Sequence, residues 1–223
     1  MERMILEFDH VTGKSGKFRL QDIHFALPAG YMMGLVGANG AGKTTCLQYV
    51  MQEKKRYTGT ILIDGEKHDA HGTAFRNKIG FVSEDNAFFE DRTGRQNVEL
   101  LRMFYDNFDR ELFIMAMKEM QVSSDKTYCK MSRGERMKFQ MAFAMAHQPK
   151  LYLLDEVTAG MDPVFRIDFF RLLHQVIEEK EAAVLMTSHI ESELKKQMDY
   201  IGILEQGRMT YFGENQDNLW ENL

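Results

Sequence analysis

The chain has 223 residues, of which 44% are hydrophobic, and its 28 Lys and Arg against 33 Asp and Glu give a formal net charge of −5. A chain of this length can bury most of its apolar surface in one domain, and an acidic balance without a strongly basic run argues against DNA or RNA as a partner. Two cysteines, Cys46 and Cys129, are too few for a disulfide framework or a four-ligand zinc site, so a cytoplasmic location is expected.

The first ten residues, MERMILEFDH, lack an apolar signal segment. No stretch of the sequence approaches the roughly 18 consecutive apolar residues that predict a membrane helix. Any membrane role is therefore expected to come through another chain.

Short apolar runs bounded by Gly, Pro or Asp recur along the chain and predict β-strands. In chain order they are MILEF, IHFAL, MMGLVG, TILIDG, IGFVS, LYLLDE, AVLMTSH and IGILEQG. The runs at 151–154 and 184–187 are continuously apolar and follow helix-like segments, which is typical of parallel strands buried on both faces. The N-terminal third is denser in short strands and turn signals, which predicts an antiparallel lobe beside the parallel sheet. The fold class is therefore α/β.

Between Asn86 and Gln148 the strand signals give way to helical spacing, which predicts a helical insert. The apolar residues with this spacing are Leu100, Leu101, Phe104, Tyr105 and Phe108, and again Met137, Met141 and Met145. Methionine is over-used in the insert, either as adaptable core packing or as a pliable docking surface for a partner's helices. These methionines are Met103, Met115, Met117, Met120, Met137, Met141 and Met145.

The strongest chemical signal is GANGAGKTT at residues 37–45, between an apolar run and a helix-like segment. It is a P-loop, in which glycines let successive backbone N–H groups converge on a polyphosphate and the helix N-terminus adds partial positive charge. Lys43 is predicted to reach the β- and γ-phosphates, and the Thr44 hydroxyl to ligate Mg²⁺. The residues predicted to bind the nucleotide here are Gly37, Asn39, Gly40, Ala41, Gly42, Lys43, Thr44 and Thr45.

The second signal is LYLLDE at residues 151–156, an apolar strand that ends in two carboxylates. This is the Walker B arrangement, in which Asp155 holds Mg²⁺ at the carboxyl edge of the sheet. The adjacent Glu156 is a candidate general base for the attacking water. The alternative is a strand that ends in two solvated acids.

In this order the motifs resemble those of the ATP-binding subunits of ABC transporters, over essentially the whole chain. LLDEVTAGMDP resembles that family's Walker B and D-loop, with Asp162 as the D-loop aspartate, and MTSHIESE resembles its switch region, with His189 as the switch histidine. MSRGERMKF stands where the family has its signature, LSGGQ. The resemblance implies a P-loop NTPase core with an antiparallel β lobe and a helical lobe. We predict one domain over 1–223, with the core and β lobe in 1–84 and 149–223 and the helical lobe in 85–148.

The resemblance also implies a head-to-tail dimer, formed with a second copy or with a paralogous ATPase. Each ATP would lie between the P-loop of one subunit and Ser132 and Gly134 of the other. Lys43, Glu156 and His189 form the expected catalytic set, with His189 donating to the γ-phosphate or orienting water. Read locally, Ser132 and Glu135 also match the S/T-x-x-E capping box of a helix start.

Three positions depart from the family pattern. Glu84 stands at the usual Q-loop glutamine, either as a Mg²⁺ ligand or as an exposed loop acid. Phe18 is the nearest aromatic residue to the expected adenine-stacking position, and simple packing is the alternative. Arg133 either adds positive charge in trans, like an arginine finger, or faces outward.

The expected function is ATP hydrolysis that drives export of a substrate through a separate integral membrane permease. That permease would dock at the helical lobe around residues 84–95 and hold the ATPase at the inner face of the membrane. The small size and the SRG-type signature resemble the ATPases of small bacterial exporters of peptides, antibiotics or lipids. The alternatives are a soluble ABC ATPase of a non-transport machine, or a nucleotide-gated dimerisation module with weak hydrolysis.

Overall fold

The protein is described by a computed structural model over residues 2–51, 56–67, 74–83, 88–159, 161–188 and 190–221. Its strands form one ten-stranded mixed sheet with the order β5-β4-β1-β2-β10-β9-β3-β8-β7-β6. The strands are β1 (Met4–Ser15), β2 (Phe18–Pro28), β3 (Met32–Val36), β4 (Tyr57–Ile63), β5 (Glu66–Lys67), β6 (Ile79–Ser83), β7 (Leu151–Asp155), β8 (Ala183–Thr187), β9 (Tyr200–Glu205) and β10 (Arg208–Glu214).

The half of the sheet that contains β3 is parallel, since β3 pairs in parallel with β8 and β9, and β7 pairs in parallel with β6 and β8. Every residue of β8 is buried, as are the first four residues of β7. Burial on both faces explains why these two strands are continuously apolar. Because β3, β8 and β7 run side by side in the same direction, their carboxyl ends share one edge of the sheet.

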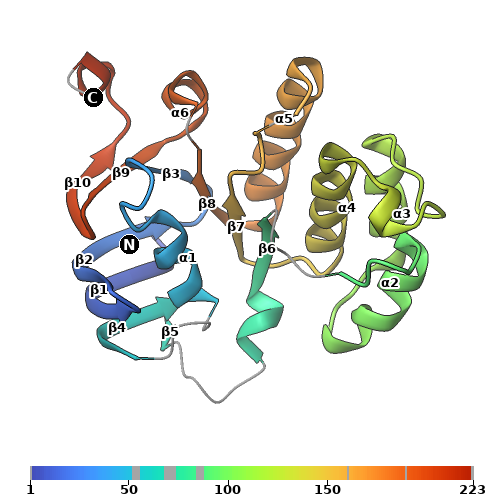
Figure 1. Cartoon of the computed structure of the whole chain (residues 1–223), viewed down its shortest axis with the longest axis horizontal. Coiled ribbons are helices and arrows are strands. Elements are labelled where there is room, and N and C mark those ends of the chain that lie inside the picture. The colour runs from blue at the N-terminus through green and yellow to red at the C-terminus, as the bar shows by residue number, and fades with distance from the viewer. Residues whose placement is uncertain are drawn as a thin grey trace.

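The other half is antiparallel: β1 pairs with β2 and β4, and β4 with β5. It joins the parallel half through β10, which pairs antiparallel with β9 and meets β2 at the single residue pair Arg208 and Gln21. The antiparallel lobe is thus continuous with the main sheet, and it forms the left side of Figure 1.

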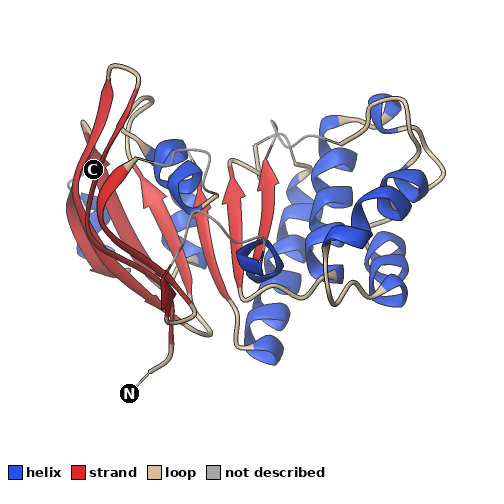
Figure 2. Cartoon of the chain, turned by 90° about the horizontal axis from the view of Figure 1, so that it is seen from below, coloured by secondary structure: helices blue, strands red, loops and turns tan. Residues whose placement is uncertain are grey.

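The helices are α1 (Lys43–Val50), α2 (Gly94–Leu101), α3 (Arg110–Glu119), α4 (Arg133–Ala146), α5 (Pro163–Lys180) and α6 (Glu191–Gln197), with short 3₁₀ turns at Ala74–Lys78, Arg102–Phe104, Tyr128–Lys130 and Asp217–Glu221. Helices α2, α3 and α4 gather at the opposite end from the antiparallel strands (Figure 1), and the view from below separates the same two ends (Figure 2). All three lie inside the segment predicted as a helical lobe; its limits, 85 and 148, stay a prediction. Within the described residues, no helix is long and apolar enough to cross a membrane.

The helical spacing predicted through Phe108 is wrong beyond Phe104. Helix α2 ends at Leu101, a 3₁₀ turn follows, and Tyr105 is extended, with φ −123° and ψ 128°. The rings of Tyr105 and Phe108 instead pack against Phe143 of α4, at centroid distances of 5.5 and 5.0 Å. Tertiary packing, not a continued helix, accounts for the apolar character of this stretch.

The structure confirms core packing for five of the seven methionines of the insert, and a docking role for the other two stays a prediction. Met117, Met120, Met137, Met141 and Met145 are buried in the core of the helical lobe. Met103 and Met115 are 73% and 66% exposed, so these two belong to the surface. Strands β5 and β10, which no apolar run predicts, were missed by the sequence reasoning.

Candidate nucleotide-binding site

A pocket of about 390 Å³ lies where the P-loop joins β3 to α1, at the carboxyl edge of the parallel strands. Its size is within the range of small-molecule sites, and this edge is where ligands of open α/β sheets bind. Its lining brings together Phe18, Asn39, Gly40, Gly42, Lys43, Thr44, Thr45 and Glu156. Gly37 and Ala41 also belong to the loop but do not line the pocket.

The P-loop requires glycine at specific positions. Gly42, directly before α1, has φ +116°, a conformation that L side chains rarely adopt. A Cβ on Gly37 would lie 2.4 Å from the Leu204 carbonyl oxygen of β9. These glycines therefore let the loop turn tightly and start the helix with its N–H groups towards the pocket.

Lys43 is only 5% exposed although it lines the pocket. Its Nζ donates to the carbonyl oxygens of Gly37, at 2.6 Å, and Ala38, at 3.3 Å. The ammonium group is thereby held over the loop itself, where it can exchange a carbonyl acceptor for a phosphate oxygen.

Asp155 ends β7 beside two hydroxyl groups. The Thr187 hydroxyl donates to Asp155 Oδ1 at 2.6 Å, and the Thr44 hydroxyl lies 3.4 Å from the same oxygen. A hydroxyl and a carboxylate oxygen at this separation are hard donors of the type that Mg²⁺ binds, so Thr44 and Asp155 fit the ion. The sequence reasoning missed Thr187; its position at the end of the strand AVLMT was the available signal.

The backbone of Glu156 is fixed by hydrogen bonds to Thr187. Its N–H donates to both the carbonyl oxygen and the hydroxyl of Thr187, each at 3.1 Å, and its φ of +52° is unusual for a residue other than glycine. The strand end of β8 thus fixes the turn that presents Glu156 to the pocket. Backbone conformations of this kind cluster at functional sites.

Phe18, the residue nearest to the expected adenine-stacking position, lies against the P-loop. A Cβ on Gly42 would come within 2.9 Å of the Phe18 ring, so the ring packs directly on the start of α1. The residue is half-buried and lines the pocket, which leaves part of the ring available to a base.

The signature segment starts α4 and does not line this pocket. The Ser132 hydroxyl accepts the Glu135 N–H at 3.2 Å, and the Glu135 carboxylate accepts the Ser132 N–H at 2.7 Å, which confirms the capping box. The Lys126 ammonium, 2.7 Å from Glu135, holds the pKa of that carboxyl below its usual value, and the Ser132 N–H adds to the effect. A Cβ on Gly134 would meet nothing within 4 Å, so the helix start is open there. Arg133 is exposed.

Asp162 is likewise outside the pocket. Its Oδ1 accepts the N–H groups of Val164 and Phe165, so it is the N-cap of α5, with Pro163 in the first turn. Two further predicted site residues, Glu84 and His189, lie outside the described residues.

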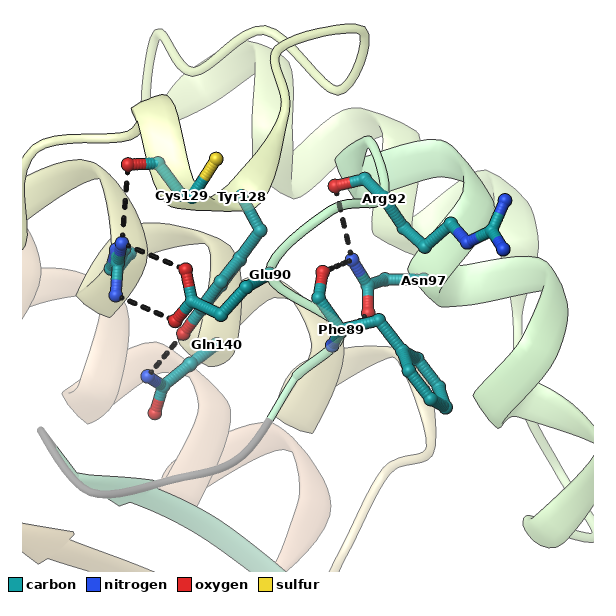
Figure 3. Close-up of polar contacts among 8 residues, drawn as sticks. Phe89, Glu90, Arg92, Asn97, Tyr128, Cys129 and Gln140 are labelled. Carbon is teal, nitrogen blue, oxygen red and sulfur yellow. Dashed lines mark hydrogen bonds and ion pairs between the residues drawn. The ribbon is translucent and has the colours of Figure 1, made fainter.

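A polar cluster ties the segment after β6 to the signature helix (Figure 3). The Glu90 carboxylate accepts hydrogen bonds from Nη1 and Nη2 of Arg136, at 3.0 and 3.1 Å. The backbone carbonyl of Glu90 accepts the Cys129 N–H. Buried Gln140 accepts the Ser83 N–H at the end of β6 and donates to the Tyr128 hydroxyl, each at 3.0 Å. A displacement of residues 88–93 would therefore be transmitted to the start of α4 through Glu90 and Arg136.

The family model described as "ABC transporter" matches residues 20–159, more than half of the sequence. The chain belongs to the ABC transporter family. This confirms the resemblance drawn from the motifs, and the matched segment includes the P-loop and the strand that ends in Asp155.

Among relatives of this ABC domain, the ABC transporter ATP-binding protein YtrB of Bacillus subtilis is 32% identical over 191 residues, which are 86% of this chain and 65% of that protein. The bacitracin transport ATP-binding protein BcrA of Bacillus licheniformis is 30% identical over 184 residues, 81% of this chain and 60% of that protein. The chain thus matches somewhat less than two thirds of the length of either.

A solved structure of the ATP binding subunit of an ABC transporter superposes with a TM-score of 0.87 at 23% identity, over 98% of this chain and 92% of that one. This likeness confirms the predicted fold class: an ABC-type P-loop core in which a mixed sheet is combined with helices.

Proposed function

We propose that the chain binds Mg²⁺-ATP in the pocket of the P-loop and hydrolyses it to drive transport. The observation that carries the proposal is the convergence of Lys43 and Thr44, at the start of α1, with Asp155 and Glu156, at the end of β7, on one edge of the sheet. Phosphate needs a cradle of donors, the ion needs oxygen ligands, and water needs a base.

In the proposed site, the backbone N–H groups of residues 37–45 and the Lys43 ammonium bind the phosphates. Thr44 and Asp155 hold Mg²⁺, which when bound neutralises charge on the phosphate oxygens. Glu156, on its fixed turn, takes the proton of the attacking water. His189 as a γ-phosphate contact and Glu84 as a further ion ligand stay predictions.

The second half of the site is proposed to come from another subunit, either a second copy or a paralogous ATPase. Ser132 and Gly134 lie at an open helix N-terminus, which favours an anion, yet they do not line the pocket of their own chain. A two-fold pair lets each open helix start meet the other subunit's nucleotide and closes the symmetry. The Ser132 hydroxyl would then exchange its capping bond for a phosphate oxygen.

A groove of about 460 Å³ beside the helical lobe supports docking of an integral membrane permease. It is lined by aromatic and apolar side chains from the core and the lobe, among them Phe75, Phe81, Phe88, Leu101, Phe104 and Phe143. Phe104, which lines the groove, is 66% exposed, and its neighbour in the chain, Met103, is 73% exposed, so large apolar side chains face solvent here. Phe88 lines this groove, and Glu90, two residues further on, binds Arg136 of α4, so a permease docked here would be linked to the signature helix.

Export is the proposed direction, and the ATPase would lie at the inner face of the membrane through its permease. The support is similarity to a bacitracin transport ATP-binding protein, together with the resemblance of the signature to small bacterial exporters.

The test is Mg²⁺-dependent phosphate release by the chain with its membrane partner. Glu156→Gln is expected to keep ATP binding and lower turnover by about a hundredfold or more, as for loss of a general base. Exposed Glu178→Gln, on α5, is the matched control and should turn over as the wild type does.

Sedimentation should show an ATP-stabilised dimer of Glu156→Gln that is absent with ADP, and Ser132→Ala should lose turnover while its monomer still binds ATP. A wild type that releases no phosphate even with its permease would favour the nucleotide-gated binding module. Copurification with a soluble machine, and no membrane protein, would favour the non-transport ATPase.

A further inference from the structure

Outside the pocket, the structure buries one carboxylate that the proposed chemistry does not use. Glu193, in the first turn of α6, is 6% exposed. Its Oε2 accepts the Thr158 hydroxyl at 2.7 Å and the Ser188 hydroxyl at 3.2 Å, and its Oε1 lies 2.9 Å from Arg166 Nε. A charge buried this deeply is costly unless it is paired and hydrogen-bonded. Here the partners of Glu193 come from the loop after β7, the loop after β8 and helix α5.

The two hydroxyl groups come from the two loops that frame the site. Thr158, which is fully buried, lies two residues after Glu156, in the loop that leads to Asp162. Ser188 is 5% exposed and directly follows Thr187, the residue that holds Asp155 and Glu156. One carboxylate oxygen therefore joins the loop after β7 to the loop after β8.

Both loops are braced further by the same cluster. Arg166 Nη2 lies 3.4 Å from the Thr158 carbonyl and 3.3 Å from the Met161 carbonyl, which shapes the loop before Asp162. The Ser188 hydroxyl accepts the Ile190 N–H at 3.0 Å. Although Arg166 Nε and Glu193 Oε1 are close, their geometry is that of an ion pair without a hydrogen bond, so the tether itself is carried by the two hydroxyls.

We propose that Glu193 is a positioning residue for ATP hydrolysis, acting through Thr158 and Ser188 to fix the Glu156 turn relative to the end of β8. The inference rests on the proposed hydrolysis of ATP. Glu193 does not line the pocket, so its effect would pass through the two hydroxyl groups and not through a contact with the nucleotide. Loss of the tether lets the carboxylate of Glu156 move relative to the γ-phosphate, and small misplacements of a catalytic group are expensive in rate.

The decisive variant is Thr158→Val in the full chain, because it keeps the shape of the side chain and removes only the hydroxyl. We expect kcat to fall by about tenfold or more, with KM and the Kd for mant-ATP within about twofold of wild type. Thr158→Ser, which restores the hydroxyl, should restore kcat. Thr210→Val, at an exposed position on β10, is the matched control and should leave all three quantities unchanged.

Glu193→Gln and Ser188→Ala should likewise lower kcat and leave KM nearly unchanged. Because the tether acts through one carboxylate, Thr158→Val combined with Glu193→Gln should be no slower than Glu193→Gln alone. Thermal unfolding and mant-ATP stoichiometry report the folded fraction, so that a loss of stability is not counted as a loss of kcat.

The inference is overturned if Thr158→Val turns over as fast as wild type, if Thr158→Ser is as slow as Thr158→Val, or if kcat and nucleotide affinity fall together. Glu156→Gln in the same assay separates the two proposals. A wild type that is no faster than Glu156→Gln overturns the proposed hydrolysis and this inference together. A fast wild type with a fast Thr158→Val overturns only the inference.

Discussion

The ring of Phe18 lies on the start of α1 and lines the nucleotide pocket, so packing and stacking are both open to it. Position along the sequence could not decide between them, because residue 18 meets Gly42 only through the fold. A ring held at one face and open to the pocket at the other can serve both roles.

Phe18→Ala is predicted to weaken ATP binding by roughly tenfold, since base–aromatic stacking contributes about 1–3 kcal/mol. Binding of inorganic triphosphate should not change, because it has no base. Competition against mant-ATP measures both ligands, with Phe104→Ala on the far lobe as the control. Equal weakening of ATP and triphosphate would assign Phe18 to packing of the P-loop.

At the scale of elements, α2 is locked to the segment that precedes it by one buried side chain. Asn97 is 0% exposed; its Oδ1 accepts the Phe89 N–H at 2.8 Å, and its Nδ2 donates to the carbonyls of Phe89, Arg92 and Thr93. Figure 3 shows Asn97 facing Phe89 and Arg92. Residues 89–92 belong to no helix or strand, so this amide supplies hydrogen bonds that regular secondary structure would otherwise provide.

Asn97→Ala is predicted to lower the free energy of unfolding by about 2 kcal/mol, since it removes a fully buried amide that accepts the Phe89 N–H and donates to three backbone carbonyls. Urea unfolding measures the change, and Asn107→Ala, at an exposed position, should alter it little. An Asn97→Ala protein as stable as Asn107→Ala would show that the amide is not what orders this segment.

The elements that the sequence predicted best are the continuously apolar strands with both faces buried, such as β7 and β8. Helix α4 began at the serine that the capping box indicated, since a cap depends on residues only three apart. The end of α2 could not be foreseen, because Tyr105 and Phe108 keep a helical spacing but pack on Phe143 instead.

For the whole molecule, His147 lies at the junction of the core and the helical lobe. Its ring nitrogens approach the carbonyl oxygens of Ile79 in β6, at 3.0 Å, and Phe143 in α4, at 3.2 Å, and the ring lies 4.2 Å from that of Tyr105. Burial lowers the pKa of His147 below its usual 6.5, despite the two carbonyls. The folded state therefore binds this proton less readily than the unfolded chain does.

Because the pKa of His147 is lower in the folded state than in the unfolded chain, the free energy of unfolding is highest above about pH 6.5, where His147 is neutral in both states. It decreases as the pH falls from there through the pKa of the folded state, because the unfolded chain takes up the proton first. Wild type is predicted to lose stability between pH 7 and pH 5 more steeply than His147→Gln, which cannot take up a proton. Urea unfolding at the two pH values gives both slopes. Equal slopes would mean that His147 binds the proton equally well in both states.

The sequence by itself determined the fold class and located the P-loop, the strand that ends in Asp155 and the cap of α4, because each depends on residues that are neighbours in the chain. Local spacing is enough to shape a glycine turn or to end an apolar strand in a carboxylate. Only the tertiary structure decided what lies beside these motifs: Thr187 on Asp155, Phe18 on Gly42, and Glu193 between two loops. The pairs Phe18 and Gly42, Asp155 and Thr187, and Thr158 and Glu193 are 24, 32 and 35 residues apart. The strand order β3-β8-β7, not any pattern within one segment, brings the ends of the loops to one edge.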